Sequence, residues 1–212
     1  MQSVKRLFGL VVCGGRSSRM GMDKSLLDYH GRPQRYYMYT MLATLCDETF
    51  ISCNKDQVGT IDEPYKIIPD ATIYEGNGPM AGVLSALDQY PGADWLIAGC
   101  DYPYITRHAL NAFIKNIDTK KTAAAFYNAA EKVYEPMLAW YSYPALDELK
   151  KMFAAKEYSL QQFLRKTNAG KYIPADIRTM HSVDTHDEYE KIKTEFAEKR
   201  QQEISSQRYT TE

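Results

Sequence analysis

A glycine pair followed by basic side chains is the first group of residues here that could do chemistry. An apolar run over 7–13 is short enough for a buried strand, and Gly14-Gly15 end it. Paired glycines let a backbone pass close to a ligand, because no Cβ blocks the approach. Successive N–H groups in such a turn bind anions, and Arg16, Arg19 and Lys24 add positive charge nearby. The segment therefore predicts a site for a triphosphate.

Two familiar phosphate-binding motifs do not fit this segment. The dinucleotide motif requires G-x-G-x-x-G, and Gly14, Gly15 and Gly21 do not have that spacing. The P-loop requires G-x-x-x-x-G-K-[ST], and Lys24-Ser25 come two residues too late after Gly21. From glycines and charges alone, a basic surface turn without a ligand is the alternative that stays open.

The order of residues in this segment is more specific than its composition. Residues 12–24 read V-C-G-G-R-S-S-R-M-G-M-D-K. They resemble the L-A-G-G-x-S-x-R-M-G-x-D-K signature of molybdenum cofactor guanylyltransferases, which belong to the nucleotidyltransferase group. The resemblance implies that Arg19 and Lys24 hold the phosphates of a nucleoside triphosphate. It also implies that the nucleotide is bound by the chain at Val12, Cys13, Gly14 and Gly15.

Two aspartates are candidate ligands for Mg²⁺. Asp101 follows the buried run at 95–100, and Mg²⁺ usually takes one or two protein carboxylates together with phosphates. Its segment, C-D-Y-P-Y-I, resembles the family's C-D-x-P-[FY]-[IL], in which the aspartate binds magnesium. Residues 183–188, V-D-T-H-D-E, resemble V-N-T-P-E-E, so Asp184 replaces the usual asparagine. The alternative is that either aspartate only caps a following helix.

Three further residues resemble positions at which the family holds its nucleotide. Asn54 follows a predicted strand in S-C-N-K, and Asp70 follows another in I-P-D. A carboxylate can accept two hydrogen bonds from the N1–H and amino groups of guanine, which cytosine cannot offer in the same geometry. Whether Asp70 contacts the base or a ribose hydroxyl stays open. Gly78 begins G-P-M-A-G, similar to the family's G-P-L-A-G, whose glycines permit close approach to the nucleotide.

Alternating strands and helices are expected to position these residues. Short apolar runs predict strands at 7–13, 49–53, 65–69, 95–100, 122–127, 132–141, 171–174 and 180–183. Helical spacing predicts helices at 34–45, 79–90, 106–117, 144–155, 159–165 and 185–198. Repeated β-α-β units predict a parallel sheet with ligands at the carboxyl ends of its strands. With the resemblance, we expect a three-layer α/β/α, Rossmann-like nucleotidyltransferase fold with a mostly parallel mixed sheet.

The chain is expected to form one domain, and it departs from the family's pattern at a further position of its second half. We expect one domain over 1–199 and a polar, flexible tail over 200–212. Residues 135–138, E-P-M-L, resemble the family's H-P-x-x-A, so Glu135 replaces the usual histidine, and whether this position contacts a pterin stays open. A surface set of lysines could attract a pterin phosphate or could simply be solvated: Lys150, Lys151 and Lys166.

Composition restricts the classes of function. The 212 residues suffice for a sizeable core, and a formal net charge of −1 gives no general field for nucleic acid or an anionic membrane. The cysteines form no C-x-x-C pair and are expected to be reduced core residues: Cys13, Cys46, Cys53 and Cys100. The apolar run after Lys5-Arg6 is short for a signal peptide and lacks small residues before Cys13. We therefore expect a cytoplasmic protein.

The resemblance also implies a specific reaction. A terminal phosphate oxygen of molybdopterin, or of its molybdenum form, would attack the α-phosphorus of GTP, with Arg19, Lys24 and Asp101 as catalytic residues and Mg²⁺ as cofactor. Molybdenum-insertion proteins and molybdoenzyme-specific chaperones would be partners. Two alternatives stay open. The first is a transferase that uses CTP or acts on another phosphorylated acceptor, and Asp184 in place of asparagine favours it. The second is a non-catalytic GTP-binding protein that delivers cofactor.

Overall fold

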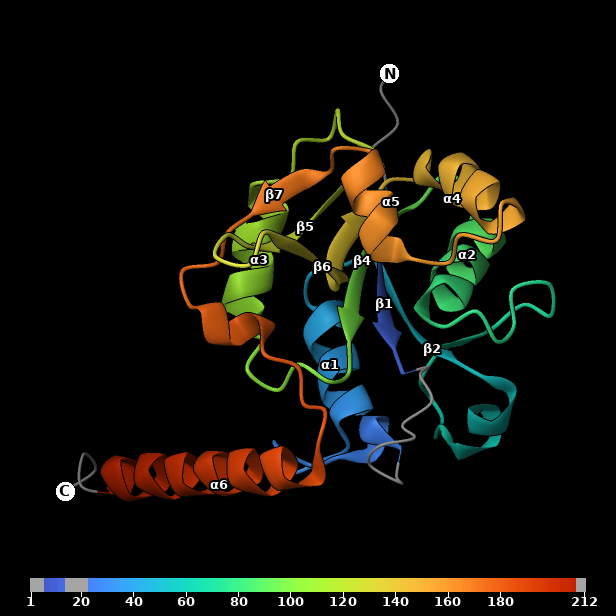
Figure 1. Ribbon diagram of the computed structural model, residues 1–212. Coiled ribbons are helices and arrows are strands. Elements are labelled where there is room, and N and C mark those ends of the chain that lie inside the picture. The colour runs from blue at the N-terminus through green and yellow to red at the C-terminus, as the bar shows by residue number, and fades with distance from the viewer. Residues whose placement is uncertain (1–5, 14–22, 209–212) are drawn as a thin grey trace.

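A mixed sheet of seven strands, in the order β3-β2-β1-β4-β6-β5-β7, forms the centre of the protein. The computed structural model describes residues 6–13 and 23–208 (Figure 1). The strands are β1 (Leu7–Val12), β2 (Glu48–Cys53), β3 (Ile67–Pro69), β4 (Asp94–Gly99), β5 (Ala123–Asn128), β6 (Val133–Tyr141) and β7 (Gly170–Tyr172). Among these strands only β6 runs antiparallel to its neighbours. The predicted mostly parallel mixed sheet is confirmed.

Alternate residues of the strands face two different layers of helices. In β1, Phe8 and Leu10 pack into one core, and Val11 packs into the other. The first core lies under α2 (Pro79–Gln89), α4 (Ala145–Ala154) and α5 (Leu160–Lys166), and the second under α1 (Gln34–Ala43) and α3 (Arg107–Lys115). Figure 1 shows these helices on the two sides of the sheet. The three-layer α/β/α architecture is confirmed.

Six of the seven strands run in the same direction, so their carboxyl ends lie at one edge of the sheet. β1, β2, β3 and β4 are parallel, so their carboxyl ends lie together. β5 runs the same way and ends at Asn128, and the antiparallel β6 begins nearby at Val133. We call this the carboxyl edge. Open sheets of this kind bind their ligands there, in the crevice outside the strand ends.

The second half of the chain contains the one strand prediction that is wrong. Residues 180–183 were expected to form a strand, but the structure has a 3-10 helix, η3 (Ile177–Met180), followed by irregular chain. Asp176 starts this turn, because its carboxylate accepts the N–H of Arg178 at 3.0 Å. Two further 3-10 turns, η1 (Lys24–Leu26) and η2 (Lys55–Thr60), are too short to leave a periodic signal in the sequence.

The last helix, α6 (His186–Arg208), is longer than predicted. Its inward residues Tyr189 and Ile192 pack with Leu27, Tyr29 and Val183 in a small separate core. Residues 199–208 contain no glycine or proline that would end the helix, and Figure 1 shows α6 projecting past the body of the protein. The division into a domain over 1–199 and a tail over 200–212 stays a prediction.

Candidate active site at the carboxyl edge

Asp101 lies near the middle of the carboxyl edge. It follows β4, which lies between β1 and β6, so the edge has one half on each side of it. The N–H of Val183 donates to the carbonyl of Asp101 at 2.9 Å and holds the segment that carries Asp184 beside it. Lys24 completes the group, with its Nζ 2.7 Å from Asp184 Oδ1. Three residues predicted to act on phosphate and metal therefore lie together.

The two aspartates are not the caps of the helices that follow them. The hydroxyl of Thr106 accepts a backbone N–H from the first turn of α3 at 3.1 Å. At α6, Thr185 Oγ1 accepts the N–H of Glu188 at 3.3 Å, and the Glu188 carboxylate accepts the N–H of Thr185 at 3.1 Å. This reciprocal pair is a capping box. The side chains of Asp101 and Asp184 are thus left for other roles.

The environment of Asp101 disfavours an isolated negative charge. Desolvation raises the pKa of this carboxyl, the nearby Lys24 opposes the rise, and the charge of Asp184 adds to it. Gly99 provides the space, because a Cβ there would lie 2.6 Å from Asp101 Oδ1 and 2.9 Å from a ring carbon of Tyr102. A desolvated carboxylate beside a second carboxylate favours a bound cation.

The donor set fits Mg²⁺. This cation prefers hard oxygen ligands and usually takes one or two carboxylates, with substrate phosphates and water completing the shell. Asp101 and Asp184 supply two such carboxylates from adjoining segments. Within residues 6–13 and 23–208, no group of three or more His, Cys, Asp and Glu side chains could hold a metal ion. A cation held by these two carboxylates would complete its shell with water and substrate phosphates.

One cavity lies on the β1 side of Asp101. It has a volume of about 510 Å³, within the size range of ligand pockets, and we call it the β1–β3 cavity. It is lined by residues at the ends of β1, β2 and β3, in η2, in the loop before α2 and in the first turn of α2: Val12, Ser52, Asn54, Lys55, Asp56, Asp70, Glu75, Gly76, Gly78, Pro79 and Gly82. Four of these were predicted to bind a nucleotide, namely Val12, Asn54, Asp70 and Gly78.

Glycine is required at two points of this wall. Gly78 precedes α2 with φ +63° and ψ −151°, a backbone conformation that side-chain-bearing residues rarely adopt. A Cβ on Gly82 would lie 2.3 Å from Ser52 Oγ and 3.7 Å from Asp70 Oδ1. The G-P-M-A-G segment therefore keeps the first turn of α2 open towards the end of β2.

Asp70 and Asn54 present polar groups to the β1–β3 cavity. The backbone N–H of Asp70 donates to the carbonyl of Cys53 at 2.9 Å, which fixes the aspartate beside the end of β2. Desolvation and the charge of Glu75 raise the pKa of Asp70 to about 6. The Asn54 Oδ1 accepts the N–H of Gln57 at 3.0 Å, so this asparagine caps η2 and lines the cavity at once.

Gln57 is a positioning residue that our sequence interpretation missed. Its side-chain Nε2 donates to Asp23 Oδ2 at 2.8 Å and to the carbonyl of Cys13 at 3.4 Å. It thereby joins the two residues that flank the segment 14–22. The capping pattern N-x-x-Q, from Asn54 to Gln57, was the available signal. Gly14, Gly15 and Arg19 lie outside the described residues.

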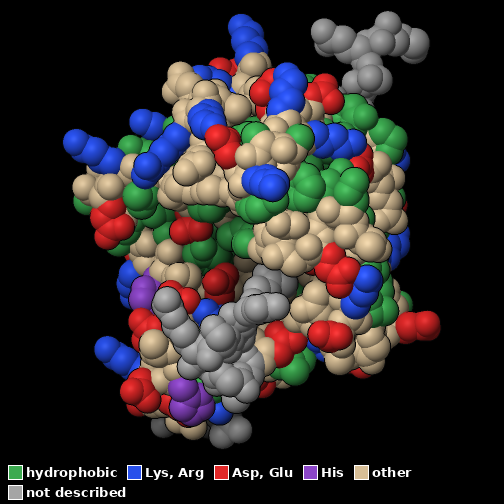
Figure 2. Space-filling model, turned by 45° about the vertical axis from the view of Figure 1, so that its right-hand side comes forward, with side chains coloured by type: hydrophobic (Ala, Val, Ile, Leu, Met, Phe, Trp, Pro, Cys, Tyr) green, Lys and Arg blue, Asp and Glu red, His purple; other side chains and the backbone are tan. Residues whose placement is uncertain are grey.

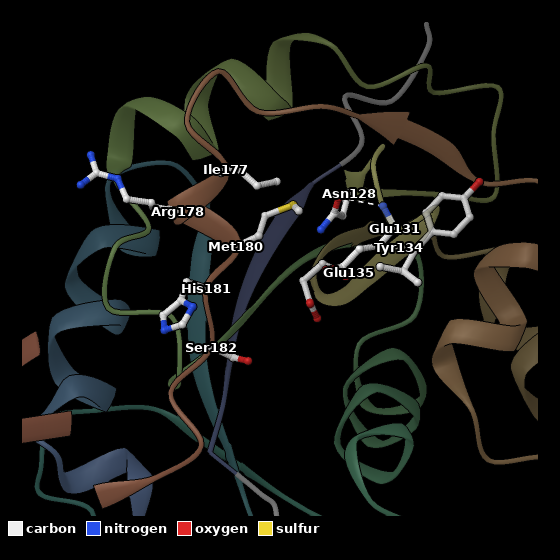
Figure 3. Close-up of a pocket in the computed structure, with 10 residues that line it drawn as sticks. Asn128, Glu131, Tyr134, Glu135, Ile177, Arg178, Met180, His181 and Ser182 are labelled. Atoms are coloured by element: carbon white, nitrogen blue, oxygen red, sulfur yellow. Dashed lines mark hydrogen bonds between the residues drawn. The ribbon is translucent and has the colours of Figure 1, made fainter. Parts of the chain in front are cut away.

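A second cavity lies on the β6 side of Asp101. It has a volume of about 410 Å³, and we call it the β5–β6 cavity. One wall is formed at the adjoining ends of β5 and β6, and the other by η3 and the chain after it: Asn128, Glu131, Val133, Tyr134, Glu135, Ile177, Arg178, Met180, His181 and Ser182. Figure 3 shows Ile177 and Met180 directed towards the β-strand wall, and Arg178 directed away from it. In Figure 2, acidic side chains lie in and beside a hollow of the visible face.

Glu135 connects the β5–β6 cavity to the centre of the site. The Tyr102 hydroxyl and the backbone N–H of Met137 lie close to its carboxylate and favour its charged form. Desolvation raises the pKa of Glu135, these two donors oppose the rise, and the charges of Asp101 and Asp184 add to it. Since Tyr102 follows Asp101 directly, Glu135 stands next to the predicted metal ligands.

The helix lysines do not take part in either cavity. In the structure each is paired with a carboxylate, Lys150 with Asp88, Lys151 with Glu148 and Lys166 with Glu157. The interpretation of these lysines as ordinary surface residues is favoured. The described cysteines are all free thiols, with three of them buried, as expected for core residues.

Comparison with known proteins assigns the family. Residues 9–171 match the model of the MobA-like NTP transferase domain. A molybdenum cofactor guanylyltransferase of Pseudomonas putida is 30% identical over 156 residues, which cover 73% of this chain and 80% of that protein. A molybdenum cofactor biosynthesis bifunctional protein of Synechocystis is 34% identical over 82% of this chain. The match spans only 46% of that protein's own length, about half.

Solved structures agree on the fold. The molybdopterin-guanine dinucleotide biosynthesis protein A of Archaeoglobus fulgidus has a TM-score of 0.72 at 19% identity, covering 90% of this chain and 99% of that chain. A CMP:2-keto-3-deoxy-manno-octonic acid synthetase complexed with CTP has a TM-score of 0.65 at 14% identity, covering 92% and 99%. Over the described residues, no helix is both long and apolar enough to cross a membrane. The chain belongs to the MobA-like NTP transferase family, which includes the molybdenum cofactor guanylyltransferases, and is a nucleotidyltransferase.

Proposed function

We propose that this protein transfers GMP from GTP to the terminal phosphate of molybdopterin. A phosphate oxygen of molybdopterin forms a bond to the α-phosphorus, the bond from that phosphorus to the α–β bridging oxygen breaks, and pyrophosphate leaves. The product is molybdopterin guanine dinucleotide. The observation that carries the proposal is the position of Asp101, Lys24 and Asp184 between two cavities, since a two-substrate transfer needs a site on each side of the reacting phosphorus.

The β1–β3 cavity is the proposed site of the guanosine. The carboxylate of Asp70 would accept hydrogen bonds from the N1–H and amino group of guanine, and the amide of Asn54 would bind nearby. The open backbone at Gly78 and Gly82 would let the nucleotide approach α2 closely. A carboxylate facing these donors favours guanine over cytosine.

Charge neutralisation at the centre is the proposed source of catalysis. Asp101 and Asp184 would hold Mg²⁺, which would supply positive charge against the phosphates and the departing pyrophosphate. Lys24 and, by resemblance, Arg19 would bind the phosphate oxygens. Because Lys24 Nζ already lies 2.7 Å from Asp184, the cation and the phosphates would be brought together by the same pair. The acceptor phosphate is ionised at neutral pH and needs no general base.

Pyrophosphate release tests this proposal. The purified protein is given molybdopterin, Mg²⁺ and one of GTP, CTP or ATP. We expect release with GTP, and a loss of several kcal/mol of transition-state stabilisation in Lys24→Ala. Release with CTP alone would show that the protein recognises cytosine and not guanine. No release despite GTP binding would favour a non-catalytic delivery protein.

The cellular context is part of the same proposal and rests on the resemblance. It places the protein in the cytoplasm, with molybdenum-insertion proteins and molybdoenzyme-specific chaperones as its partners. Neither nucleic acid nor a membrane would be a partner, because the net charge of −1 supplies no general attraction for them.

A further inference from the structure

We infer that Glu135 determines which acceptor binds, by accepting hydrogen bonds from N–H donors on the heterocycle of the acceptor in the β5–β6 cavity. This inference rests on the proposed function, because it concerns the second substrate of the same transfer. It assigns a role to a residue of the β5–β6 cavity that the proposed transfer does not otherwise use.

The backbone of β6 directs Glu135 into the cavity. The pairing of β5 with β6 is interrupted, because Ala125 pairs with Ala139 while the next residue, Phe126, pairs with Glu135. The intervening residues of β6 bulge out, and the Tyr141 hydroxyl donates to the carbonyl of Pro136 within the bulge at 3.1 Å. Bulges next to active sites commonly re-aim a side chain. Figure 3 shows Glu135 projecting from β6 towards the opposite wall.

The carboxylate of Glu135 has capacity left for a ligand. The Tyr102 hydroxyl and the N–H of Met137 approach it from two different segments and favour its charged form. An ionised carboxylate offers about four acceptor sites on its two oxygens. Two neighbouring donors can use at most two of these sites, so the others are left for a ligand, and only a hydrogen-bond donor can use them.

The remaining lining of the cavity also favours a ligand with hydrogen-bond donors over an anionic ligand. Glu131 adds a second carboxyl group to the wall, whereas the guanidinium of Arg178 is bound to Asp176, with Nη2 2.9 Å from Oδ2. Figure 3 shows this arginine pointing away from the cavity. Ile177 is 53% exposed and, with Met180, forms an apolar wall opposite the strands. A flat heterocycle with N–H groups on its edge fits this combination.

The position of the cavity gives the bound acceptor its direction. Its anionic phosphate would be repelled by Glu135 and attracted towards Lys24 and the cation site at Asp101 and Asp184. The heterocycle would therefore lie against Glu135 and the phosphate at the centre of the site. A phosphorylated substrate that presents an anion or a hydrogen-bond acceptor atom to Glu135 would be excluded.

Acceptor kinetics in Glu135→Gln test this role. The amide keeps an acceptor oxygen for Tyr102 and Met137 but loses the charge and one acceptor group, so the variant is expected to fold. We expect the KM for molybdopterin to rise about tenfold or more, with the KM for GTP within about twofold of wild type. Glu135→Asp, which keeps the charge but shortens the reach, is expected to raise the same KM less. Glu157→Gln, the same change at a surface residue paired with Lys166, is the control.

Equilibrium binding of molybdopterin without GTP separates this inference from the proposed function. The dissociation constant is expected to rise in Glu135→Gln by the same factor as the KM. Wild-type binding without turnover would contradict the proposed transfer but leave the role of Glu135 supported if the variant binds more weakly. An unchanged KM and dissociation constant in both folded Glu135 variants would overturn the inference. So would a rise confined to the KM for GTP, or a wild-type protein that does not bind molybdopterin.

Discussion

The two cavities beside Asp101 are built from different kinds of structure. The β1–β3 cavity lies at the ends of parallel strands and at the first turn of a helix, all within the residues matched by the family model. The β5–β6 cavity has one wall on the antiparallel pair and the other on residues 177–182, which follow the last matched residue, 171. Regular elements thus hold the site proposed for the nucleotide, and irregular chain completes the site proposed for the acceptor. Loops are where specificity changes most easily.

The largest effect is expected at the position shared by both cavities. Asp101→Asn removes a carboxylate from the proposed cation site while keeping the size of the side chain. We expect pyrophosphate release to slow by about 10²-fold to 10³-fold, on the scale of preorganised electrostatic groups. Asp118→Asn, at an exposed turn, is the control. Activity of Asp101→Asn close to that of the control would show that the Asp101 carboxylate is not needed for the transfer.

Gly99→Ala is expected to damage both halves of the site together. The new Cβ would lie 2.6 Å from Asp101 Oδ1 and 2.9 Å from the Tyr102 ring, so the carboxylate and the buried ring must shift. Overpacking of this kind costs about 1–3 kcal/mol of unfolding free energy. Thermal denaturation and the KM for each substrate measure the two effects. Gly59→Ala is the control, because nothing lies within 4 Å of the added Cβ, and its Tm and KM values should match those of the wild type. Equal Tm and KM values in Gly99→Ala and Gly59→Ala would show that Gly99 does not provide needed space.

Asp70→Asn is expected to affect the β1–β3 cavity alone. The amide accepts only through its single oxygen, so GTP should bind about tenfold more weakly at pH 8, with the KM for molybdopterin unchanged. Because the pKa of Asp70 is raised to about 6, the wild-type affinity for GTP should also fall below that pH as the carboxyl becomes protonated. The variant should lack this dependence. The dissociation constant for GTP, measured between pH 5 and 8, tests this difference. The same dependence on pH in the wild type and in Asp70→Asn would exclude Asp70 as the base-binding group.

The same residue predicts a dependence of stability on pH. The folded protein binds the Asp70 proton more tightly than the unfolded chain, whose carboxyl groups titrate near pH 4. The wild type therefore loses stability from this group as the pH rises from about 4 through about 6. The Tm of Asp70→Asn relative to wild type should increase over that range and level off above it. A Tm difference that does not vary with pH would contradict the raised pKa.

The smallest effect is expected on the lysine-rich surface outside both cavities. Lys166→Ala breaks an exposed ion pair with Glu157, and such pairs contribute less than about 1 kcal/mol. The KM for molybdopterin should stay within about twofold of wild type. A large rise would show that the acceptor phosphate reaches this surface, and the β5–β6 cavity would lose its proposed occupant.

Local rules predicted one half of the site better than the other. Asn54, Asp70 and Asp101 each follow a short apolar run, and a parallel sheet necessarily brings such positions to one edge. The fold followed from the same regular alternation of strands and helices. Residues 177–182 carry no periodicity and were partly taken for a strand, because their position depends on tertiary contacts such as the hydrogen bond from Val183 to Asp101. Gln57 was missed for the same reason, since its partners Cys13 and Asp23 lie far away in sequence.

Separate labelling of the α- and γ-phosphates of GTP distinguishes guanylyl transfer from hydrolysis of the nucleotide. Each labelled nucleotide is incubated with the protein, Mg²⁺ and molybdopterin, and the products are separated. If GMP is transferred, the α label moves to the pterin product and the γ label to pyrophosphate, and both require the acceptor. Release of the γ label as orthophosphate, or of the α label as GMP without acceptor, would contradict guanylyl transfer between the two cavities.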